Sequence, residues 1–419
     1  MIEIKTKQIR DCSIDLPGSK SYTHRLLIAA ALADGVSVIG KPLRSEDTLL
    51  TMGALRQMGI KIEDRGDHMI VCGGGGLLKP ADKDIYLANS GTSMRLLMGI
   101  AALGAGPYTL TGTQRMEQRP VTELLGALRQ IGVRAESVRN TGCPPLRIGG
   151  GDIAGGKVRI DCRVSSQYLS ALLLMAPYTK NGLEIEVSGL VSRPYVELTL
   201  DIMERLGVTV ERRGYEWFKV SGGQVFRAGE YTVEPDCSQA SYFWAAAAVT
   251  GKRIKVMDIS ENSRQGDVRF ARVLEKMGCK VFHENDGIAV QGPALHGVAV
   301  DMSDMPDVVP TLAVVAAFVE GETFVKNVAH LREKECDRLG CVATELNRMG
   351  VSATATESGL VIRGGAPKGA SIATYNDHRM AMCFAVAGLV VPGVVIENAS
   401  CVEKSFPEYW TVFETLYEK

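Results

Sequence analysis

The sequence predicts an α/β fold of two similar domains. Each domain is built from three βαβαββ units whose first helix is buried, in the manner of an inside-out α/β barrel. Three series of features support this prediction, and each recurs about every 70 residues along the 419-residue chain. Because the three series keep the same phase, chance similarity among ordinary α/β units is a weak alternative.

The first series consists of amphipathic helices with apolar residues three and four positions apart, as in LLGALRQIGVRAE. Each helix is followed by a glycine, where we expect the chain to leave in a left-handed conformation and to enter a short strand. These glycines are spaced by 71 to 75 residues and are Gly59, Gly132, Gly207, Gly278 and Gly350. The C-terminal FETLYEK begins a sixth copy.

The second series consists of helices that are apolar nearly all round, such as SMRLLMGIAALGAG, which predicts that they are buried. Each has a polar or charged cluster at its start. These helices begin near Ser21, Thr92, Ser166, Ser238, Pro310 and Arg379.

The third series consists of strands that end in glycine, such as WFKVSGG and LVIRGG. Together the series give a unit that reads strand, buried helix, strand, surface helix, strand, strand. Six such units divide naturally into two domains of three. The opening strand in CSIDLPG precedes the first helix, so from the residues alone the N-terminus can complete either domain.

Composition excludes several classes of protein. A net charge of −1 with 46% hydrophobic residues excludes a disordered chain and argues against a general nucleic-acid binder. The N-terminal MIEIKTKQIR lacks a signal peptide and no apolar run is long enough to span a membrane, so we expect a cytoplasmic protein. The ten cysteines and six histidines show no metal-binding spacing, so we expect no metal site.

The starts of the buried helices carry residues that suit a small anionic substrate. Helix N-termini expose unpaired N–H groups and partial positive charge, and six of them could face one crevice. The polar residues and glycine at these starts are Lys20, Ser21, Arg25, Gly91, Ser165, Ser166, Gln167, Asp307 and Arg379. Segments between them add Arg119, Ser192, Tyr195, Lys334, Glu335, Arg338 and Lys404.

Two carboxylates stand among these cations. Asp307 follows a proline and opens an apolar helix, where its ordinary function is a helix cap. Glu335 lies between Lys334 and the Asp337–Arg338 pair, where its ordinary function is a surface ion pair. As a base or an acid, either group would depend on precise placement next to the substrate.

Eight motifs follow one another along essentially the whole chain. They are LPGSKS, NSGTSMRL, SSQYLSALLL, VSRPYVELT, DMPD, REKECDRL, YNDHRMAM and EKSFPEYW. In this order they resemble the 5-enolpyruvylshikimate-3-phosphate synthase family, whose two domains of three βαβαββ units agree with the repeats. The resemblance implies that residues 1–20 and 230–419 form the domain containing both termini, and that residues 21–229 form the inserted domain.

The resemblance also implies the reaction. Phosphoenolpyruvate transfers its enolpyruvyl group to the 5-hydroxyl of shikimate 3-phosphate, by addition and elimination through a tetrahedral intermediate, and phosphate is released. This step belongs to aromatic amino acid biosynthesis. It needs no cofactor, and we expect a monomer without nucleic-acid or membrane partners, whose substrates lie between two domains that close on binding.

Residue functions carry over position by position from the resemblance. Asp307 is the candidate base for the 5-hydroxyl, Glu335 is the candidate acid for C3 of phosphoenolpyruvate, and Lys20 shares either proton. The contacts to shikimate 3-phosphate would be Lys20, Ser21, Arg25, Ser165, Ser166, Gln167, Ser192, Tyr195, Asp307 and Lys334. The contacts to phosphoenolpyruvate would be Lys20, Gly91, Arg119, Gln167, Arg338, Arg379 and Lys404.

Some positions depart from common family patterns. His330 stands where many members have asparagine, and Leu96 stands where some have proline. Ser90 and Ser93 replace small neighbours of Gly91. These changes bear on substrate contacts near Gly91 and His330 and leave the expected reaction unchanged.

Two alternatives stay open, and the second is from another class of protein. The first is the related enolpyruvyl transferase that acts on UDP-N-acetylglucosamine, but the loop cysteine of that family has no counterpart between Cys72 and Cys143. The second is a non-catalytic repeat scaffold or an RNA-end-binding protein of the same fold. A scaffold would not require Lys20, Asp307 and Glu335 together, and an RNA binder should show strong salt dependence.

Overall fold

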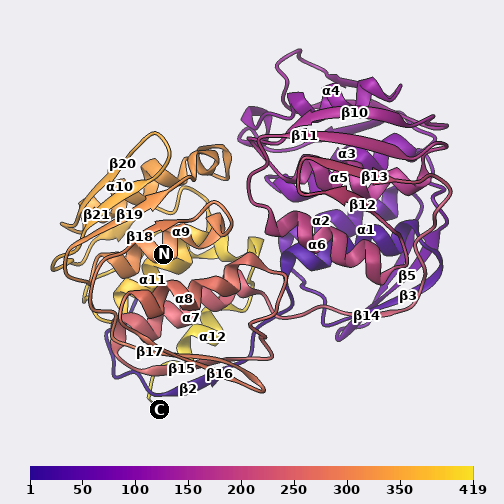
Figure 1. Cartoon of the computed structure of the whole chain (residues 1–419). Coiled ribbons are helices and arrows are strands. Elements are labelled where there is room, and N and C mark those ends of the chain that lie inside the picture. The colour runs from indigo at the N-terminus through magenta and orange to yellow at the C-terminus, as the bar shows by residue number, and fades with distance from the viewer. Residues whose placement is uncertain (419) are drawn as a thin grey trace. The chain divides into compact units, whose positions relative to one another are not determined.

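The chain divides into two compact units in a computed structural model that describes residues 1–418 (Figure 1). Unit 1 joins Met1–Pro17 to the chain from Pro235 onward, and unit 2 is the continuous segment Gly18–Glu234. The boundaries expected from the sequence, after residues 20 and 229, lie a few residues away. Lys20 is the first residue of a helix in unit 2, so it lies with the inserted segment and not with the N-terminal strand.

The helices of the small-residue series begin within one residue of their predicted starts and are buried almost throughout. In unit 2 they are α1 (Lys20–Leu32), α3 (Gly91–Leu103) and α5 (Gln167–Met175). In unit 1 they are α7 (Cys237–Thr250), α9 (Val309–Ala316) and α11 (His378–Gly388). Each set forms the centre of its unit's hydrophobic core, because helices that are apolar all round cannot face water.

The amphipathic helices bury one face and leave the other to solvent. They are α2 (Glu46–Gln57), α4 (Thr122–Gln130), α6 (Pro194–Arg205), α8 (Phe270–Lys276), α10 (Arg338–Arg348) and α12 (Tyr409–Glu414). The glycines after the first five have positive φ, from 80° at Gly350 to 108° at Gly278. This left-handed backbone favours glycine, which confirms the predicted helix ends.

Each complete repeat forms a small sheet in which the first strand is parallel to the second and the remaining pairs are antiparallel. In the second repeat the order is β6 (Ile85–Tyr86), β7 (Tyr108–Thr111), β9 (Leu146–Gly149) and β8 (Arg134–Ser137). In the third it is β10 (Gly156–Asp161), β11 (Leu183–Ser188), β13 (Trp217–Val220) and β12 (Glu211–Arg213). In the fifth it is β18 (Ala299–Asp301), β19 (Glu322–Lys326), β21 (Leu360–Arg363) and β20 (Ser352–Ala355).

The first and fourth repeats exchange their opening strands. β2 (Cys12–Ile14) precedes α1 but completes a unit 1 sheet with β15 (Arg253–Met257), β17 (Gly287–Gln291) and β16 (Lys280–Glu284). β14 (Glu230–Thr232) precedes α7 but completes a unit 2 sheet with β3 (Asp34–Gly40), β5 (His68–Gly74) and β4 (Lys61–Asp64). The N-terminal strand therefore completes unit 1, which answers the question that the residues left open.

The sixth repeat is also completed from the N-terminus. β22 (Ser371–Ile372) pairs in parallel with β23 (Val395–Ile396), and β1 (Ile2–Glu3) pairs antiparallel with β23. Short 3₁₀ helices lie within the repeats: η1 (Met116–Gln118), η2 (Ala176–Tyr178), η3 (Gly266–Arg269), η4 (Pro306–Val308), η5 (Ala329–Glu333) and η6 (Ala399–Lys404). Within residues 1–418, no helix combines the length and apolarity that crossing a membrane requires.

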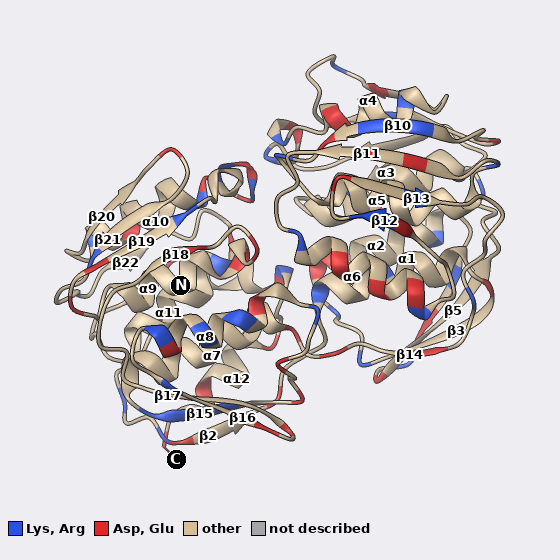
Figure 2. Ribbon diagram, viewed as in Figure 1, with Lys and Arg blue, Asp and Glu red and all other residues tan. Residues whose placement is uncertain are grey.

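Charged residues of both signs are interspersed along the elements of each unit (Figure 2). This pattern accords with the net charge of −1. A functional site in either unit is therefore better recognised by charged groups that are buried than by a dense surface patch, because buried charges are rare unless they are paired or used.

Candidate active site

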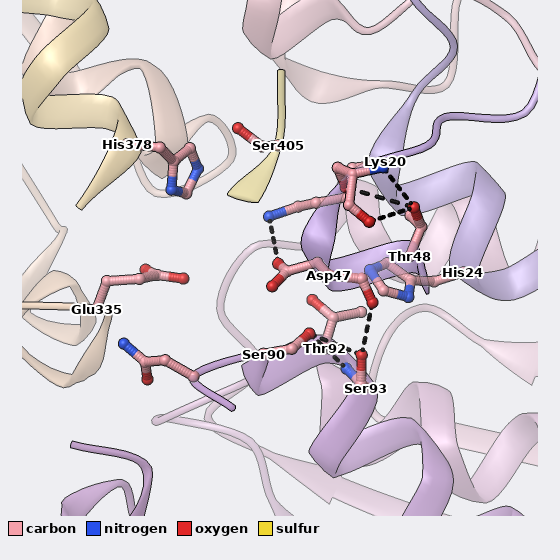
Figure 3. A network of polar contacts seen from close by, with 12 residues as sticks. Lys20, His24, Asp47, Thr48, Ser90, Thr92, Ser93, Glu335, His378 and Ser405 are labelled. Carbon is pink, nitrogen blue, oxygen red and sulfur yellow. Dashed lines mark hydrogen bonds and ion pairs between the residues drawn. The ribbon is translucent and has the colours of Figure 1, made fainter. Parts of the chain in front are cut away.

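In unit 2, polar side chains link the starts of α1 and α3 through α2. Lys20 Nζ donates to Asp47 Oδ2 at 3.1 Å, as Figure 3 shows. His24 Nδ1 lies 2.8 Å from Thr51 Oγ1, and the Thr51 hydroxyl donates to Ser93 Oγ at 2.8 Å. Since Asp47 and Thr51 both belong to α2, this helix fixes the two buried helix starts at one end of unit 2.

Gln167 extends the same network to the start of α5. Its Nε2 donates to Thr92 Oγ1 at 2.9 Å, and its Oε1 accepts from Arg95 Nη1 at 3.0 Å. Its backbone N–H donates to Ser165 Oγ at 3.2 Å. Ser165 and Ser166 are both buried. The predicted residues at the starts of α1, α3 and α5 are therefore brought to one end of unit 2.

Arg25 is fully buried among neutral oxygens. Its Nε donates to Thr199 Oγ1 at 2.8 Å and its Nη1 to the Ser21 carbonyl at 3.0 Å. Its Nη2 donates to the Tyr195 carbonyl at 3.1 Å and to Ser170 Oγ at 3.3 Å. Burial lowers the pKa of Arg25 to about 10, so it stays cationic at neutral pH. Across residues 1–418 no carboxylate forms an ion pair with it, which suits an anionic ligand.

Gly91 leaves space for the buried side chain of Arg119. Arg119 Nη1 donates to the Asn89 carbonyl at 3.0 Å and to Asn89 Oδ1 at 3.2 Å. A Cβ at position 91 would lie 2.5 Å from Arg119 Nη2. That distance is shorter than any ordinary contact, so a larger residue at this position would displace the guanidinium group.

Ser192 occupies a strained turn next to Arg25. Its φ is 54°, and its carbonyl accepts from the Tyr195 backbone N–H at 3.1 Å just before α6. A residue other than glycine in this region costs of the order of 1 to 3 kcal/mol and often belongs to a ligand site. The turn joins the predicted residues Ser192 and Tyr195, and the Tyr195 carbonyl contacts the Arg25 guanidinium.

In unit 1, Asp307 bridges two buried arginines. Its Oδ1 accepts from Arg338 Nη1 at 3.0 Å, and its Oδ2 accepts from Arg379 Nη2 at 2.7 Å. Asp307 lies in η4 immediately before α9, and α9 has no side-chain cap. Its carboxylate therefore holds the arginines instead of capping the helix, so the cap reading of this residue is wrong.

Arg338 gathers three carboxylates at the start of α10. Besides Asp307, its Nε donates to Asp377 Oδ2 at 2.8 Å and its Nη2 to Glu335 Oε2 at 2.8 Å. Burial alone would lower the pKa of Arg338, but the charges of Asp377, Glu335 and Asp307 raise it well above its usual value. Asp377 is fully buried and caps α11 by accepting from the Arg379 N–H at 2.9 Å.

Two lysines and a histidine lie in or directly after the short helices of unit 1. Lys404 is buried at the end of η6, which packs on α11, and half-buried Lys334 follows η5. His330 in η5 is buried too, and this burial, together with the charge of Lys334, lowers its pKa to about 3. His330 is therefore neutral at physiological pH and can serve there as a hydrogen-bonding group and not as a cation.

The predicted site residues thus fall into two groups. Unit 2 contains Lys20, Ser21, Arg25, Gly91, Arg119, Ser165, Ser166, Gln167, Ser192 and Tyr195, and unit 1 contains Asp307, Lys334, Glu335, Arg338, Arg379 and Lys404. Sequence reasoning missed the partners Asp47, Thr199 and Asp377. Only Asp377 carried a usable signal, as the N-cap of α11. In the described part of the chain, His, Cys, Asp and Glu side chains form no group that could hold a metal ion.

Known proteins resemble this chain over nearly its whole length. The family model for EPSP synthase (3-phosphoshikimate 1-carboxyvinyltransferase) matches residues 5–413. A 3-phosphoshikimate 1-carboxyvinyltransferase of Syntrophobacter fumaroxidans is 45% identical over 96% of both chains. A chloroplastic one of Brassica napus is 42% identical over 99% of this chain and 85% of its own. The solved structure of an Acinetobacter baumannii EPSP synthase superposes with a TM-score of 0.83 at 28% identity, covering 99% of this chain and 97% of that one. The chain belongs to the EPSP synthase family.

Proposed function

We propose that this chain catalyses the reaction of its family, the transfer of the enolpyruvyl group of phosphoenolpyruvate to the 5-hydroxyl of shikimate 3-phosphate, with release of phosphate. The reaction is a step of aromatic amino acid biosynthesis. Relatives of matching length carry the name of this activity, which favours it over the UDP-N-acetylglucosamine alternative. The observation that supports the residue functions best is the Asp307 carboxylate shared by Arg338 and Arg379.

Phosphoenolpyruvate carries a phosphate and a carboxylate, which guanidinium groups bind by two-point contacts. We assign it to Arg338, Arg379 and Lys404 of unit 1 and to Lys20, Gly91, Arg119 and Gln167 of unit 2. The three arginines and Lys404 are all buried, and a charge contact is stronger away from water. Gly91 supports the assignment because it lets Arg119 lie against the start of α3, where an anion is favoured.

We assign shikimate 3-phosphate to Lys20, Ser21, Arg25, Ser165, Ser166, Gln167, Ser192 and Tyr195 of unit 2, with Asp307 and Lys334 of unit 1 at its hydroxyl groups. Arg25 is the strongest support. Because its present partners are neutral oxygens, it can receive a phosphate without first breaking an ion pair. The serine hydroxyl groups add neutral donors.

The chemical steps then follow from two carboxyl groups. Asp307 takes the proton of the 5-hydroxyl group as the hydroxyl oxygen attacks C2 of phosphoenolpyruvate. Glu335 delivers a proton to C3. The tetrahedral intermediate then loses a proton from C3 and releases phosphate from C2. Lys20 shares either proton. Each positioned acid or base contributes about 10²- to 10⁴-fold to the rate.

Ligand binding has to change the partners of both carboxyl groups first. Asp307 is a poor base while two arginines hold its oxygens, because opposite charges favour its ionised form. The anionic groups of phosphoenolpyruvate compete for Arg338 and Arg379 and thereby release Asp307. Glu335 shares Arg338, so the same exchange releases it as well. Substrate binding therefore prepares the catalytic groups, which is a form of induced fit.

The proposed contacts to phosphoenolpyruvate come from both units, so both must touch it at once, and we expect them to close on the substrates. We further propose a cytoplasmic monomer that acts on small molecules alone. Neither a metal nor an organic cofactor is needed, because arginines and lysines offset the substrate charges and Asp307 and Glu335 move the protons.

The experiment that tests this function is phosphate release with phosphoenolpyruvate and shikimate 3-phosphate together. We expect release that needs both substrates and that stops when UDP-N-acetylglucosamine replaces shikimate 3-phosphate. A folded protein that releases no phosphate with the first pair contradicts the proposal. Release with UDP-N-acetylglucosamine instead would establish the alternative.

A further inference from the structure

Asp267 is a buried carboxyl group of unit 1 to which the proposed mechanism gives no function. It lies in η3, which leads directly into α8, and it is 4% exposed. Its Oδ2 accepts a hydrogen bond from the Ser238 hydroxyl in the first turn of α7. Gln265 fixes this arrangement, since its side chain accepts from the Cys237 N–H at 3.1 Å and donates to the Pro235 carbonyl at 2.7 Å.

The surroundings of Asp267 belong to the proposed active site. The same helix α7 carries Tyr242, whose hydroxyl accepts from Arg379 Nη1 at 3.3 Å. Arg379 in turn donates to Asp307. The charges of Asp307 on η4, Arg379 on α11 and Asp236 at the cap of α7 all act on Asp267. The short helices η3 and η4, which carry Asp267 and Asp307, both pack against α7, and the side chain of Asp267 bonds to Ser238 and not to the proposed base.

The cluster around these groups has more acids than bases. Its carboxyl groups are Asp267, Asp307, Glu335 and Asp377, and its arginines are Arg338 and Arg379. Asp307, Glu335 and Asp377 each hydrogen-bond to an arginine, whereas Asp267 bonds to a hydroxyl group. In the described chain no lysine or arginine forms an ion pair with Asp267.

A buried carboxyl group without a cationic partner is the member that keeps its proton. Burial, together with the charges of Asp307 and Asp236, raises the pKa of Asp267 to about 7, while Arg379 and the Ser238 hydrogen bond oppose the rise. Below pH 7 the group is therefore neutral, and above pH 7 it adds a negative charge near Arg379.

We propose that Asp267 is a positioning residue whose protonated form keeps Arg379 available to Asp307 and to the anionic groups of phosphoenolpyruvate. The substrate part of this inference rests on the proposed function of Arg379. When Asp267 is ionised, its negative charge partly offsets the positive charge of Arg379. Phosphoenolpyruvate binding is then weaker. Conversely, bound phosphoenolpyruvate adds negative charge to the cluster and holds the proton on Asp267.

The test is the KM for phosphoenolpyruvate between pH 5.5 and 9 in the full-length enzyme and in Asp267→Asn, which fixes the neutral form. We expect equal KM values near pH 6. Above pH 7 the wild-type KM should rise about tenfold relative to the variant. This is the size of effect expected from one added charge near Arg379 in partly buried surroundings. Taking the ratio of the two enzymes cancels the titration of the substrate itself.

Two further variants separate this effect from a structural one. Ser238→Ala removes the hydrogen bond that favours the ionised form, so the rise in KM should remain but move to higher pH. Asp304→Asn, which removes a partly exposed carboxylate of the same unit paired with Arg269 at 3.7 Å, should leave the profile unchanged. The inference is overturned if the KM of Asp267→Asn depends on pH as that of the wild type does. It is also overturned if Asp304→Asn changes the pH dependence of KM as much as Asp267→Asn does.

An infrared measurement tests the protonation without relying on turnover. The carbonyl band of a protonated carboxylic acid should be present in the wild type at pH 6, weaken through pH 7 and be absent from Asp267→Asn. If the band behaves so but no phosphate is released, the proposed function fails and the protonated carboxyl stands. If phosphate is released but the two spectra are identical, the inference about Asp267 fails alone.

Discussion

The two units hold their buried arginines in opposite ways. In unit 2, Arg25 donates to hydroxyl and carbonyl oxygens. In unit 1, Arg338 and Arg379 donate to the carboxylates of Asp307 and Asp377. Unit 2 therefore offers a cation that an anion can approach directly. Unit 1 offers cations that an anion obtains only by displacing an internal partner, and this difference makes the second site responsive to its ligand.

The largest effect should come from Asp307, the carboxylate at the centre of the exchange. Asp307→Asn removes the proposed base and should lower kcat about 10²- to 10⁴-fold, while shikimate 3-phosphate still binds. Steady-state phosphate release and calorimetric binding measure the two quantities. The matched control is Asp304→Asn, which changes a partly exposed carboxylate three residues away and should retain activity. A kcat near the wild-type value in Asp307→Asn would show that another group is the base.

Stability should distinguish the two kinds of arginine. Arg338→Gln leaves the fully buried Asp377 without its cation, and should lower the free energy of unfolding by about 3 to 5 kcal/mol. Arg25→Gln strands no carboxylate and should cost only the lost hydrogen bonds, about 1 to 3 kcal/mol. Urea unfolding of both variants measures the difference. If both variants lose the same free energy of unfolding, the difference in arginine partners between the units does not affect stability.

Binding should reverse that order for shikimate 3-phosphate. Arg25→Gln removes a charged donor from the proposed phosphate contact, and should raise the KM for shikimate 3-phosphate about 10- to 100-fold. The KM for phosphoenolpyruvate should change far less. Arg44→Gln, which alters a partly exposed arginine of unit 2 paired with Asp64, is the matched control and should leave both constants unchanged. Parallel increases in both KM values for Arg25→Gln would argue against separate anion sites.

The smallest effect should come from one methyl group in unit 2. In Gly91→Ala the new Cβ displaces Arg119, so the KM for phosphoenolpyruvate should rise by about tenfold, equivalent to ~1.4 kcal/mol of binding. Gly126→Ala in α4 is the matched control, because no atom lies within 4 Å of the added Cβ. It should leave the kinetics unchanged and slightly favour the helix. An unchanged KM in Gly91→Ala would remove Arg119 from the proposed contacts.

Local signals carried most of the fold prediction. Glycine at a left-handed helix end and a helix that is apolar all round are properties of short segments, so the buried helices were located to within one residue. The exchange of β2 and β14 was not predictable in this way. Both are three-residue strands, and their partners are determined by how whole repeats pack.

The candidate site shows the same division. The residue types at the helix starts indicated a site for anions, because charge and helix polarity are written in local sequence. Their partners were not predictable, since Arg25 contacts Thr199 from 174 residues away and Arg338 contacts Asp377 from 39 residues away. Whether an arginine meets a hydroxyl or a carboxylate follows from packing, and that choice separates the two units.

The exchange of strands also has a consequence for the order of the chain. Unit 1 is interrupted by unit 2, yet the ends of unit 1 lie together, because Arg10 N–H donates to the Leu416 carbonyl at 3.0 Å and the Glu418 N–H to the Gln8 carbonyl at 3.0 Å. A circular permutant that begins at Pro235, links the old termini and ends at Glu234 would make each unit continuous. The backbone would then pass between the units once instead of twice. Such a chain could show how far the second crossing restrains motion between the units.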